Sequence, residues 1–387
     1  MTQARDIFIV ANSATEMGGV ARWAHQMAGL FSERGHRVTV VGIVPPPEGQ
    51  ELALAADLPY DVVTLHDVHP GGAVWNPNRT RDRLLRVQAR RQESARQESI
   101  QRAADKLSAL FRAARPGGMV IVAQIWAMEW VVRADTAGLP VIGMSHESFA
   151  ASKASSRFAR VQKYYADADR LVLLTTEDSD QWIRQGMNRA TAIPNPTPVS
   201  PDAEPSPRAA KTVVSVGRLS REKGFDLLLE AWAEAAPSRP DWRLRIYGSG
   251  EAEASLRAYC TELGLDDSVE FAGQTQDVPG ALREGSVFAQ ASRAEGFPLT
   301  LLEAMSCGLP CVAFDCAPGV HEIVTDEEDG LLARPGSTME LARKLGRLMD
   351  DQALRDEMGE RARKSVQRFA PDVVVSRWEE LFGLLER

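Results

Sequence analysis

The segment SRAEGFPLTLLEAMSCGLP, residues 292–310, links a predicted strand to a predicted helix through a polar turn, and the rest of the chain can be interpreted as its support. The apolar run 287–289 before it predicts a buried strand. Gly296 and Pro298 interrupt regular structure, and Pro298 suits the first turn of a helix. Good helix formers follow it, so we predict a helix that begins near Pro298.

Two glutamates flank the start of that helix and predict a ligand site. The backbone N–H groups near Phe297 and Leu299 lack partners within the helix, and with the helix dipole they favour an anion such as a phosphate. Glu295 precedes the helix, and Glu303 lies about one turn inside it. Because the vicinal hydroxyls of a ribose or hexose can donate to a carboxylate, the two acids could hold opposite ends of a nucleotide sugar. An ordinary amphipathic helix with a capping glutamate is the alternative.

Size and composition point to a two-domain globular protein. The chain has 387 residues, of which 44% are hydrophobic and 25% are charged. A net charge of -8 argues against general binding of nucleic acid. No apolar run approaches the roughly 20 residues that cross a bilayer, and the first residues lack the apolar length of a secretory signal. We therefore expect a cytoplasmic location.

The first half of the chain reads as alternating strands and helices. An apolar run at 7–10, the pair Gly18-Gly19, helical spacing over 20–31 and a second apolar run at 38–41 predict a parallel βαβ unit of a Rossmann-like domain. Further strands are predicted at 62–65, 119–122, 141–144 and 171–174. Gly18 and Gly19 could let a phosphate or sugar approach the backbone, or could serve a tight turn, since the full dinucleotide fingerprint is missing.

A polar cluster, Ser145-His146-Glu147-Ser148, follows the predicted strand 141–144. Open α/β sheets place their ligands at the carboxyl ends of strands, so His146 and Glu147 are candidate site residues. A structural histidine with satisfied hydrogen bonds is the alternative for His146.

Cysteines and paired aspartates are the candidate metal ligands. The cysteines are Cys260, Cys307, Cys311 and Cys316. Cys311 lies in the apolar run 310–314, and no histidine completes a zinc set, so we predict reduced thiols, buried and inert. Asp167-Ala168-Asp169 precedes a strand, and Asp178-Ser179-Asp180 opens a helix where Thr176 and the acids would cap it. We expect no bound metal.

Residues 78–115 form a polar segment without proline or glycine, and they predict one or two helices. Its first part is rich in arginine: Arg79, Arg81, Arg83, Arg86, Arg90, Arg91, Arg96 and Arg102. A solvated face is the ordinary interpretation. The alternative is contact with an anionic acceptor or with an anionic membrane surface, which would place the protein peripherally at the inner membrane face.

The second half repeats the alternation after a Pro/Ser-rich linker at 196–210. Strands are predicted at 213–216, 244–247 and 269–271, and the closing helices at 339–349, 354–369 and 371–385. The predicted domains are 1–195 and 211–369, with 370–387 as a final helix. Arg218 and Lys223 lie on a glycine-bounded loop after a strand, where a guanidinium and an ammonium group would neutralise a diphosphate.

These motifs together resemble a known family. Gly217-Arg218-Leu219, then Glu222-Lys223-Gly224, then Glu295-Gly296-Phe297-Pro298 with Glu303 eight positions after Glu295, resemble the signature of the retaining glycosyltransferases of family 4. The resemblance implies the GT-B fold, two Rossmann-like doubly wound parallel-sheet domains facing across a cleft, with the last helix crossing back to the first domain.

The resemblance also implies residue roles. It gives as donor-binding residues Gly217, Arg218, Lys223, Gly248, Gly273, Glu295, Gly296, Phe297, Pro298, Leu299 and Glu303. Catalytic roles fall to His146, Arg218, Lys223 and Glu295. On the acceptor side the cleft is lined by Gly18, Gly19, His146 and Glu147, with glutamate where the family more commonly has aspartate.

The activity implied by the resemblance is metal-independent transfer of a hexosyl unit from a nucleoside diphosphate sugar to a hydroxyl acceptor, without a cofactor. UDP-glucose or UDP-N-acetylglucosamine is the expected donor, and the acceptor is a cell-wall, polymer, lipid or secondary-metabolite hydroxyl. In the family the acceptor attacks the front face and the leaving phosphate accepts its proton. A sugar-nucleotide epimerase of the same fold and a nucleotide-binding pseudo-enzyme are the alternatives.

Overall fold

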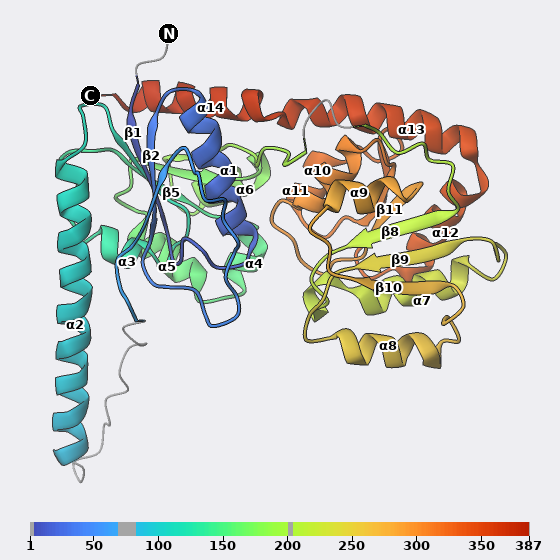
Figure 1. Ribbon diagram of the computed structural model, residues 1–387, viewed down its shortest axis with the longest axis horizontal. Coiled ribbons are helices and arrows are strands. Elements are labelled where there is room, and N and C mark those ends of the chain that lie inside the picture. Colours follow the sequence, from blue (N-terminus) through green and yellow to red (C-terminus); the bar gives the residue numbers. More distant parts are fainter. Residues whose placement is uncertain (1–3, 69–82, 200–203, 387) are drawn as a thin grey trace.

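A computed structural model describes residues 4–68, 83–199 and 204–386, with side chains in the second range from Ala89 onward. Two parallel sheets, each with helices on both faces, lie side by side (Figure 1). This is the doubly wound α/β architecture predicted from the alternation of apolar strands and amphipathic helices.

The N-terminal sheet has seven parallel strands in the order β3-β2-β1-β4-β5-β6-β7. The strands are β1 Asp6–Ala11, β2 Arg37–Gly42, β3 Asp61–Thr64, β4 Met119–Val122, β5 Val141–Met144, β6 Arg170–Leu173 and β7 Ala190–Ala192. The helices are α1 Gly19–Glu33, α2 Arg83–Arg112, α3 Met128–Val131, α4 Phe149–Lys153, α5 Arg157–Tyr164 and α6 Thr176–Arg184. The described part of the segment 78–115 therefore contains a single long helix, α2, which stands along the outer edge of this domain (Figure 1).

The C-terminal sheet has six parallel strands in the order β10-β9-β8-β11-β12-β13. They are β8 Thr212–Val216, β9 Arg243–Tyr247, β10 Val269–Gly273, β11 Val287–Gln290, β12 Cys311–Phe314 and β13 Gly330–Ala333. The α-helices are α7 Phe225–Ala235, α8 Glu253–Glu262, α9 Val278–Arg283, α10 Leu299–Ser306, α11 Pro318–Ile323, α12 Thr338–Asp350, α13 Gln352–Ser365 and α14 Pro371–Leu385. Two short 3₁₀ turns, η1 Arg221–Lys223 and η2 Val366–Phe369, complete the chain.

Strand β1 shows why the N-terminal sheet needs helices on both faces. Its side chains alternate, so that Ile7 and Ile9 join the apolar cluster with α1, while Phe8 and Val10 join the one with α2. The ring of Phe8 meets the edge of Phe111 on α2 with centroids 5.2 Å apart. A near-continuous apolar strand is therefore buried from both sides.

Helix α14 leaves the C-terminal domain and packs on α1 of the N-terminal domain (Figure 1). Trp378 is fully buried, and its ring centroid lies 6.1 Å from that of Trp23 on α1. Phe382 packs on Phe31 of the same helix. The cluster that contains these residues continues into α10, so one apolar core runs through the contact between the domains.

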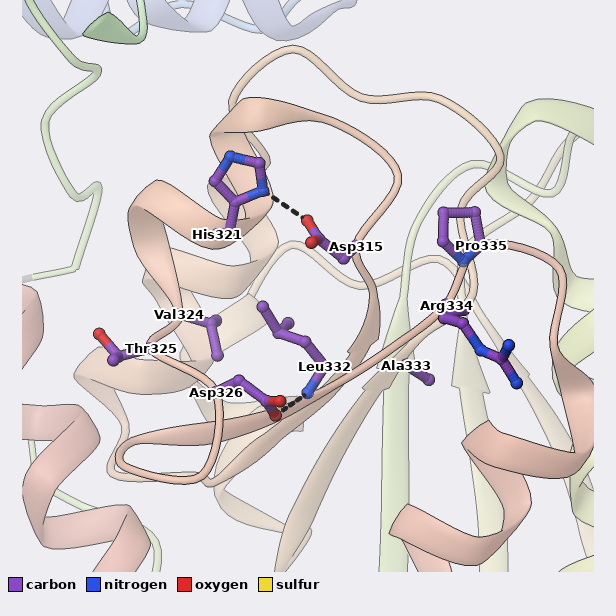
Figure 2. Close-up of a pocket in the computed structure, with 9 residues that line it drawn as sticks. All are labelled: Asp315, His321, Val324, Thr325, Asp326, Leu332, Ala333, Arg334 and Pro335. Carbon is purple, nitrogen blue, oxygen red and sulfur yellow. Dashed lines mark hydrogen bonds and ion pairs between the residues drawn. The ribbon is translucent and has the colours of Figure 1, made fainter. Parts of the chain in front are cut away.

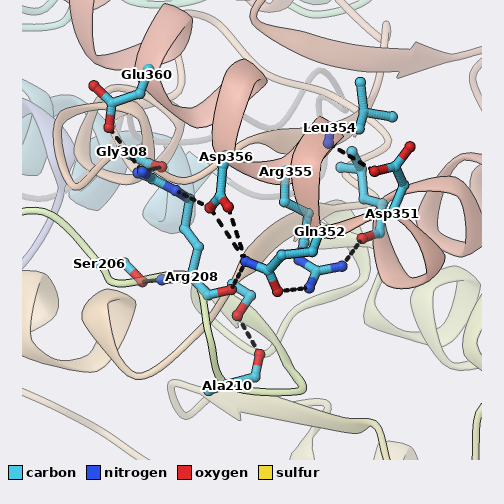
Figure 3. Close-up of polar contacts among 12 residues, drawn as sticks. Ser206, Arg208, Ala210, Gly308, Asp351, Gln352, Leu354, Arg355, Asp356 and Glu360 are labelled. Atoms are coloured by element: carbon cyan, nitrogen blue, oxygen red, sulfur yellow. Dashed lines mark hydrogen bonds and ion pairs between the residues drawn. The ribbon is translucent and has the colours of Figure 1, made fainter.

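The segment predicted as a linker does not behave as a free tether where the structure describes it. The side chain of Arg208, which has φ of +53°, donates to the carbonyl of Gly308 at 2.9 Å and pairs with Asp356 and Glu360 on α13 (Figure 3). Ser206 Oγ donates to the carbonyl of Gly285 at 2.6 Å. These bonds fasten residues 204–210 to the C-terminal domain, which composition alone could not indicate.

The sequence analysis missed several elements. Strand β7 is three residues long and half-buried, and β13 is a four-residue run that begins with glycine, so neither gives a clear apolar pattern. Short helices such as α3 and α4 were also missed. Over the described ranges, no helix combines the length and the apolar character needed to span a bilayer.

Candidate active site

The loop after β8 meets the loop after β11 at one close contact. Lys223 Nζ donates to Glu295 Oε1 at 2.7 Å. The two loops can approach each other because residue 224 is glycine. Gly224 has φ of +65°, and a Cβ at this position would overlap the carbonyl oxygen of Ala291. The sequence places these residues 72 positions apart, and the parallel sheet brings them together at the carboxyl ends of neighbouring strands.

Glu295 is held by a second donor. Ser292 Oγ donates to the same Oε1 oxygen at 2.6 Å, and the residue is only 9% exposed. The other carboxylate oxygen, Oε2, accepts no hydrogen bond from any residue in the described ranges. The carboxylate is thus fixed in orientation and keeps one oxygen for a ligand.

Backbone hydrogen bonds join the loop after β8 to the end of β9, and the loop after β9 to the end of β10. Gly217 N donates to the carbonyl of Tyr247 at 3.0 Å, and Gly248 N donates to that of Gly273 at 2.8 Å. Gly248 has φ of +142°, and a Cβ there would overlap the carbonyl oxygen of Gly217. Arg218 lies exposed on the first of these loops, and its side chain contacts neither Lys223 nor Glu295.

Helix α10 begins at Leu299 with Pro298 as its extended N-cap, and no side chain caps its first N–H groups. Phe297, just before it, is buried against Phe369 with ring centroids 5.4 Å apart. The amino end of α10 therefore presents backbone donors without a side-chain acceptor, as the sequence predicted.

Glu303 lies on the same helix but makes no contact with Lys223 or Glu295. Burial raises the pKa of its carboxyl to about 7, and the positive charge of Arg22 on α1 partly opposes this shift. Part of its surface remains accessible. Arg22, which the sequence analysis missed, is thus the charged group of the N-terminal domain that acts on Glu303.

The N-terminal domain reaches this site through His146. A Cβ on Gly296 would overlap the carbonyl oxygen of His146, and one on Gly319 would overlap that of Gly296. The backbones of the segments after β5, β11 and β12 therefore touch, and this contact joins the two domains. Glycine is required here because no side chain fits between the strands' ends.

The His146 imidazole packs edge-on against Trp23 with centroids 5.0 Å apart. Its Nε2 atom is buried and finds no hydrogen-bond partner among the described residues. Burial lowers the pKa of His146 to about 4, so the ring is neutral near pH 7. A satisfied structural histidine, the alternative considered above, would not leave Nε2 without a partner.

The other predicted acceptor-side residues, Glu147, Gly18 and Gly19, follow strands β5 and β1 of the N-terminal sheet. Glu147 pairs with Arg157 at 2.9 Å. Burial raises the pKa of Glu147, Arg157 opposes that shift, and Glu222 of the other domain adds to it. Gly18 is the N-cap of α1 with extended backbone, φ 173°, and a Cβ at Gly18 or Gly19 would meet nothing within 4 Å. Neither glycine is needed for a tight turn, so space is left at the amino end of α1.

The paired aspartates have structural partners. Asp169 Oδ2 accepts from Val141 N at 2.9 Å, and Asp178 Oδ1 accepts from Phe149 N at 2.7 Å. The N-cap of α6 is Thr175, one residue before the predicted Thr176. No group of three potential metal ligands occurs in the part of the chain that the structure describes. Cys260, Cys307 and Cys311 are buried and all four thiols are free.

The basic segment is only partly described. Arg79 and Arg81 lie outside the described residues, as do the side chains of Arg83 and Arg86. Arg96 is nearly buried and pairs with Glu93 and Glu129. Arg90, Arg91 and Arg102 are exposed on α2. Only some of the arginines of this segment are therefore exposed and able to contact an anion, whereas the sequence alone indicated a uniformly basic face.

A pocket of about 360 Å³ lies beside the carboxyl ends of β12 and β13 (Figure 2). His321 on its wall contacts Asp315 with Nδ1 and Oδ1 2.6 Å apart, and Glu177 of the N-terminal domain at 3.3 Å. Burial disfavours the imidazolium, but these two acids outweigh it and raise the pKa of His321. None of the predicted site residues lines this pocket, and the contact of His321 with Glu177 is a second contact between the domains.

Comparison with known proteins places this geometry in context. Over 98% of the chain, the structure superposes on Staphylococcus aureus TarM bound to fondaparinux, α-GlcNAc-glycerol and UDP, with a TM-score of 0.79, 14% identity and 99% coverage of that chain. The fold is GT-B. Residues 198–365 match the family model of the glycosyl transferases group 1, which takes in Lys223, Glu295 and Glu303 but less than half of the chain.

Curated relatives match in sequence over part of their length. An exopolysaccharide phosphotransferase of Streptomyces coelicolor is 42% identical over 219 residues, which are 55% of this chain and 23% of that protein. An uncharacterized glycosyltransferase of Haemophilus influenzae is 34% identical over 220 residues, 56% of this chain and 62% of its own. The chain thus spans less than two thirds of either relative.

Proposed function

We propose that this GT-B protein transfers a hexosyl unit from a nucleoside diphosphate sugar to a hydroxyl acceptor with retention of anomeric configuration. The observation that carries the proposal is the contact of Lys223 with Glu295 beside the uncapped amino end of α10. A cation and helix amides at one point suit a diphosphate, and a fixed carboxylate with a free oxygen suits a sugar hydroxyl.

The proposed roles follow from this geometry. Arg218 and Lys223, with the amides after Phe297, would stabilise the charge that develops on the departing diphosphate. Glu303 would accept hydrogen bonds from the ribose, and Glu295 from the transferred sugar. The unpartnered Nε2 of neutral His146 would bind a sugar hydroxyl from the opposite domain. Gly18, Gly19 and Glu147 would line the acceptor side.

The donor is proposed to carry uridine and glucose or N-acetylglucosamine. The TarM structure, which holds UDP and α-GlcNAc-glycerol, supports this choice by similarity of fold. No metal ion is assigned a role, because side chains and helix amides would supply the positive charge. Chelation with EDTA should then leave turnover unchanged.

A panel of nucleotide sugars tested by thermal shift would identify the donor, since a ligand that binds only the native state raises its stability with the logarithm of saturation. We expect a UDP-sugar to raise the melting temperature, and product NMR to show the same anomeric configuration as the donor. No shift with any nucleotide sugar would refute the proposal. Conversion of the donor to an epimer without acceptor would indicate the epimerase instead.

Two further proposals concern the location of the protein and the contacts of its α2 arginines. The protein would work in the cytoplasm, and the exposed arginines of α2 would contact an anionic acceptor or membrane. Replacing Arg83, Arg86, Arg90 and Arg91 by Gln should then raise the acceptor KM or abolish liposome binding. No change in either would remove the second proposal.

A further inference from the structure

Helices α4 and α5 carry positive charge without any negative charge. Residues 148–166 contain Lys153, Arg157, Arg160 and Lys163 and not one Asp or Glu, in a chain whose net charge is -8. Such a local excess is unusual in an acidic protein, and it attracts anions toward this surface.

The cations of α5 share one side of the helix. At 3.6 residues per turn, Arg157, Arg160, Lys163 and Tyr164 fall within about a third of its circumference, and the buried Val161 lies outside this arc. The Arg160 guanidinium lies 3.8 Å from the ring centroid of Trp126, and Lys163 Nζ lies 4.7 Å from that of Tyr164. Packing on aromatic rings holds these charges in place. We call Trp126, Arg157, Arg160, Lys163 and Tyr164 the α5 surface.

The α5 surface begins at the candidate active site. Arg157 contacts Glu147, which directly follows His146 at the carboxyl end of β5. Trp126 follows β4, the neighbouring strand. A chain bound along α5 could therefore reach from Lys163 past Arg160 to the contact between the domains.

The composition of the α5 surface favours a dissolved polyanion over a bilayer. Membrane-bound helices combine basic residues with exposed apolar ones that enter the interface. Among the described residues, the exposed large hydrophobic side chains are Met17, Val68, Val132, Ile183, Met339, Val373 and Leu384, none of which lies within 148–166. Apart from the half-buried rings of Trp126 and Tyr164, the α5 surface has no apolar side chain to enter a bilayer, and its arginine and lysine side chains suit phosphate or carboxylate groups in water.

We propose that the α5 surface binds the anionic groups of a glycan or polyol-phosphate acceptor, whose terminal hydroxyl then lies beside His146. This inference rests on the proposed glycosyl transfer and adds the chemical class of the acceptor. Arg160 and Lys163 would pair with phosphodiester or carboxylate groups one or more units away from the reacting hydroxyl.

The test uses the full chain and a fluorescently labelled oligomer of glycerol phosphate, with uncharged oligoglycerol of the same length as its neutral match. The variant R160Q/K163Q removes two charges from the α5 surface. The control R343Q/K364Q removes two exposed charges from the C-terminal domain. We expect R160Q/K163Q to weaken binding of the charged oligomer about tenfold or more, as loss of charge-assisted hydrogen bonds does, and the control to leave it unchanged. R160K, which keeps the charge, should retain binding if R160Q unfolds.

Three outcomes would overturn the inference: equal binding by R160Q/K163Q and its control, equal binding of the charged and neutral oligomers, or preference for phosphatidylglycerol liposomes over the oligomer. Stabilisation by a UDP-sugar is measured in the same preparations. If a UDP-sugar stabilises the protein but the charged oligomer does not bind, the inference fails alone. If the oligomer binds and no nucleotide sugar stabilises the protein, the proposed function fails and the acceptor assignment fails with it.

Discussion

Lys223 and Glu295 lie 2.7 Å apart, between Nζ and Oε1, although each comes from a different loop of the C-terminal sheet. The side chain of Glu295 is 7% exposed, so the ammonium group compensates a carboxylate that has little contact with water. The pair is placed where a diphosphate would meet the amino end of α10.

Substituting Lys223 with Ala should lower kcat/KM for the donor about 10²- to 10³-fold, because it removes a positive charge aimed at the developing negative charge of the leaving group. Steady-state kinetics with the donor identified by thermal shift measures this. Lys211→Ala is the matched control. It breaks an exposed ion pair, in which Lys211 Nζ lies 2.8 Å from Asp241 Oδ2, and it should change neither kcat/KM nor the melting temperature by much. Turnover of Lys223→Ala near that of the wild type would contradict the role.

Glu303 should impose a pH dependence on donor use. Its pKa of about 7 means that the carboxylate needed to accept ribose hydroxyls forms only as pH rises through that value. We expect kcat/KM for the donor to rise between pH 6 and pH 8 in the wild type, and Glu303→Gln to be slow and independent of pH there. His146, with its pKa of about 4, does not titrate in this range. A flat wild-type profile would count against the assignment.

The same shift has a consequence for stability. A folded pKa above the ordinary 4.5 means that the native state binds more protons than the unfolded state between pH 4.5 and about 7. The stability contribution of Glu303 therefore falls as pH rises through this window. Glu303→Gln should melt at a higher temperature than the wild type at pH 8 and at a similar temperature at pH 4.5.

Gly296→Ala should separate the domains, because a Cβ there would overlap the carbonyl oxygen of His146. We expect a larger radius of gyration in solution scattering, together with a loss of kcat/KM. Gly383→Ala on α14 is the control, since its Cβ would meet nothing within 4 Å. Scattering and turnover that both match the wild type would show that the contact is dispensable.

Gly18→Ala tests whether a ligand lies against the glycine pair. The extended backbone and open surroundings of Gly18 accept an alanine, so the melting temperature should not fall. If a phosphate or sugar lies against this backbone, kcat/KM should drop about 10- to 100-fold through misplacement of the ligand. Gly29→Ala, in open space on the same helix, should keep full activity and gain up to about 1 kcal/mol of stability. Unchanged activity of Gly18→Ala would exclude close approach of a ligand.

The sequence predicted the fold because most of the sheet strands are short apolar runs, and the carboxyl ends of parallel strands meet at one edge. Together with the family resemblance, that rule placed Lys223 and Glu295 in one predicted donor site. It could not supply the contact of Gly296 with His146, since the relative placement of two domains depends on side chains far apart in the chain. Arg22 was missed for the same reason, because its effect on Glu303 exists only across the two domains.

The α5 surface is also indicated by the sequence. The nineteen residues 148–166 are free of acidic side chains, which is visible without any coordinates. We predicted the arginine-rich segment of α2 as the candidate anion-binding region, although Arg96 in that segment forms ion pairs with Glu93 and Glu129. A count of arginines does not distinguish a charge that is already paired from one that is available, and residues beside the stretch must be counted too, since Arg157 pairs with Glu147.

Helix α14 covers Trp23 and Phe31, which lie far from it in the sequence. During synthesis the first domain emerges from the ribosome long before residues 371–385, so this apolar strip of α1 stays bare until α14 has been made. The nascent chain must be shielded from aggregation during that interval, and any truncation that removes α14 would leave the strip permanently exposed.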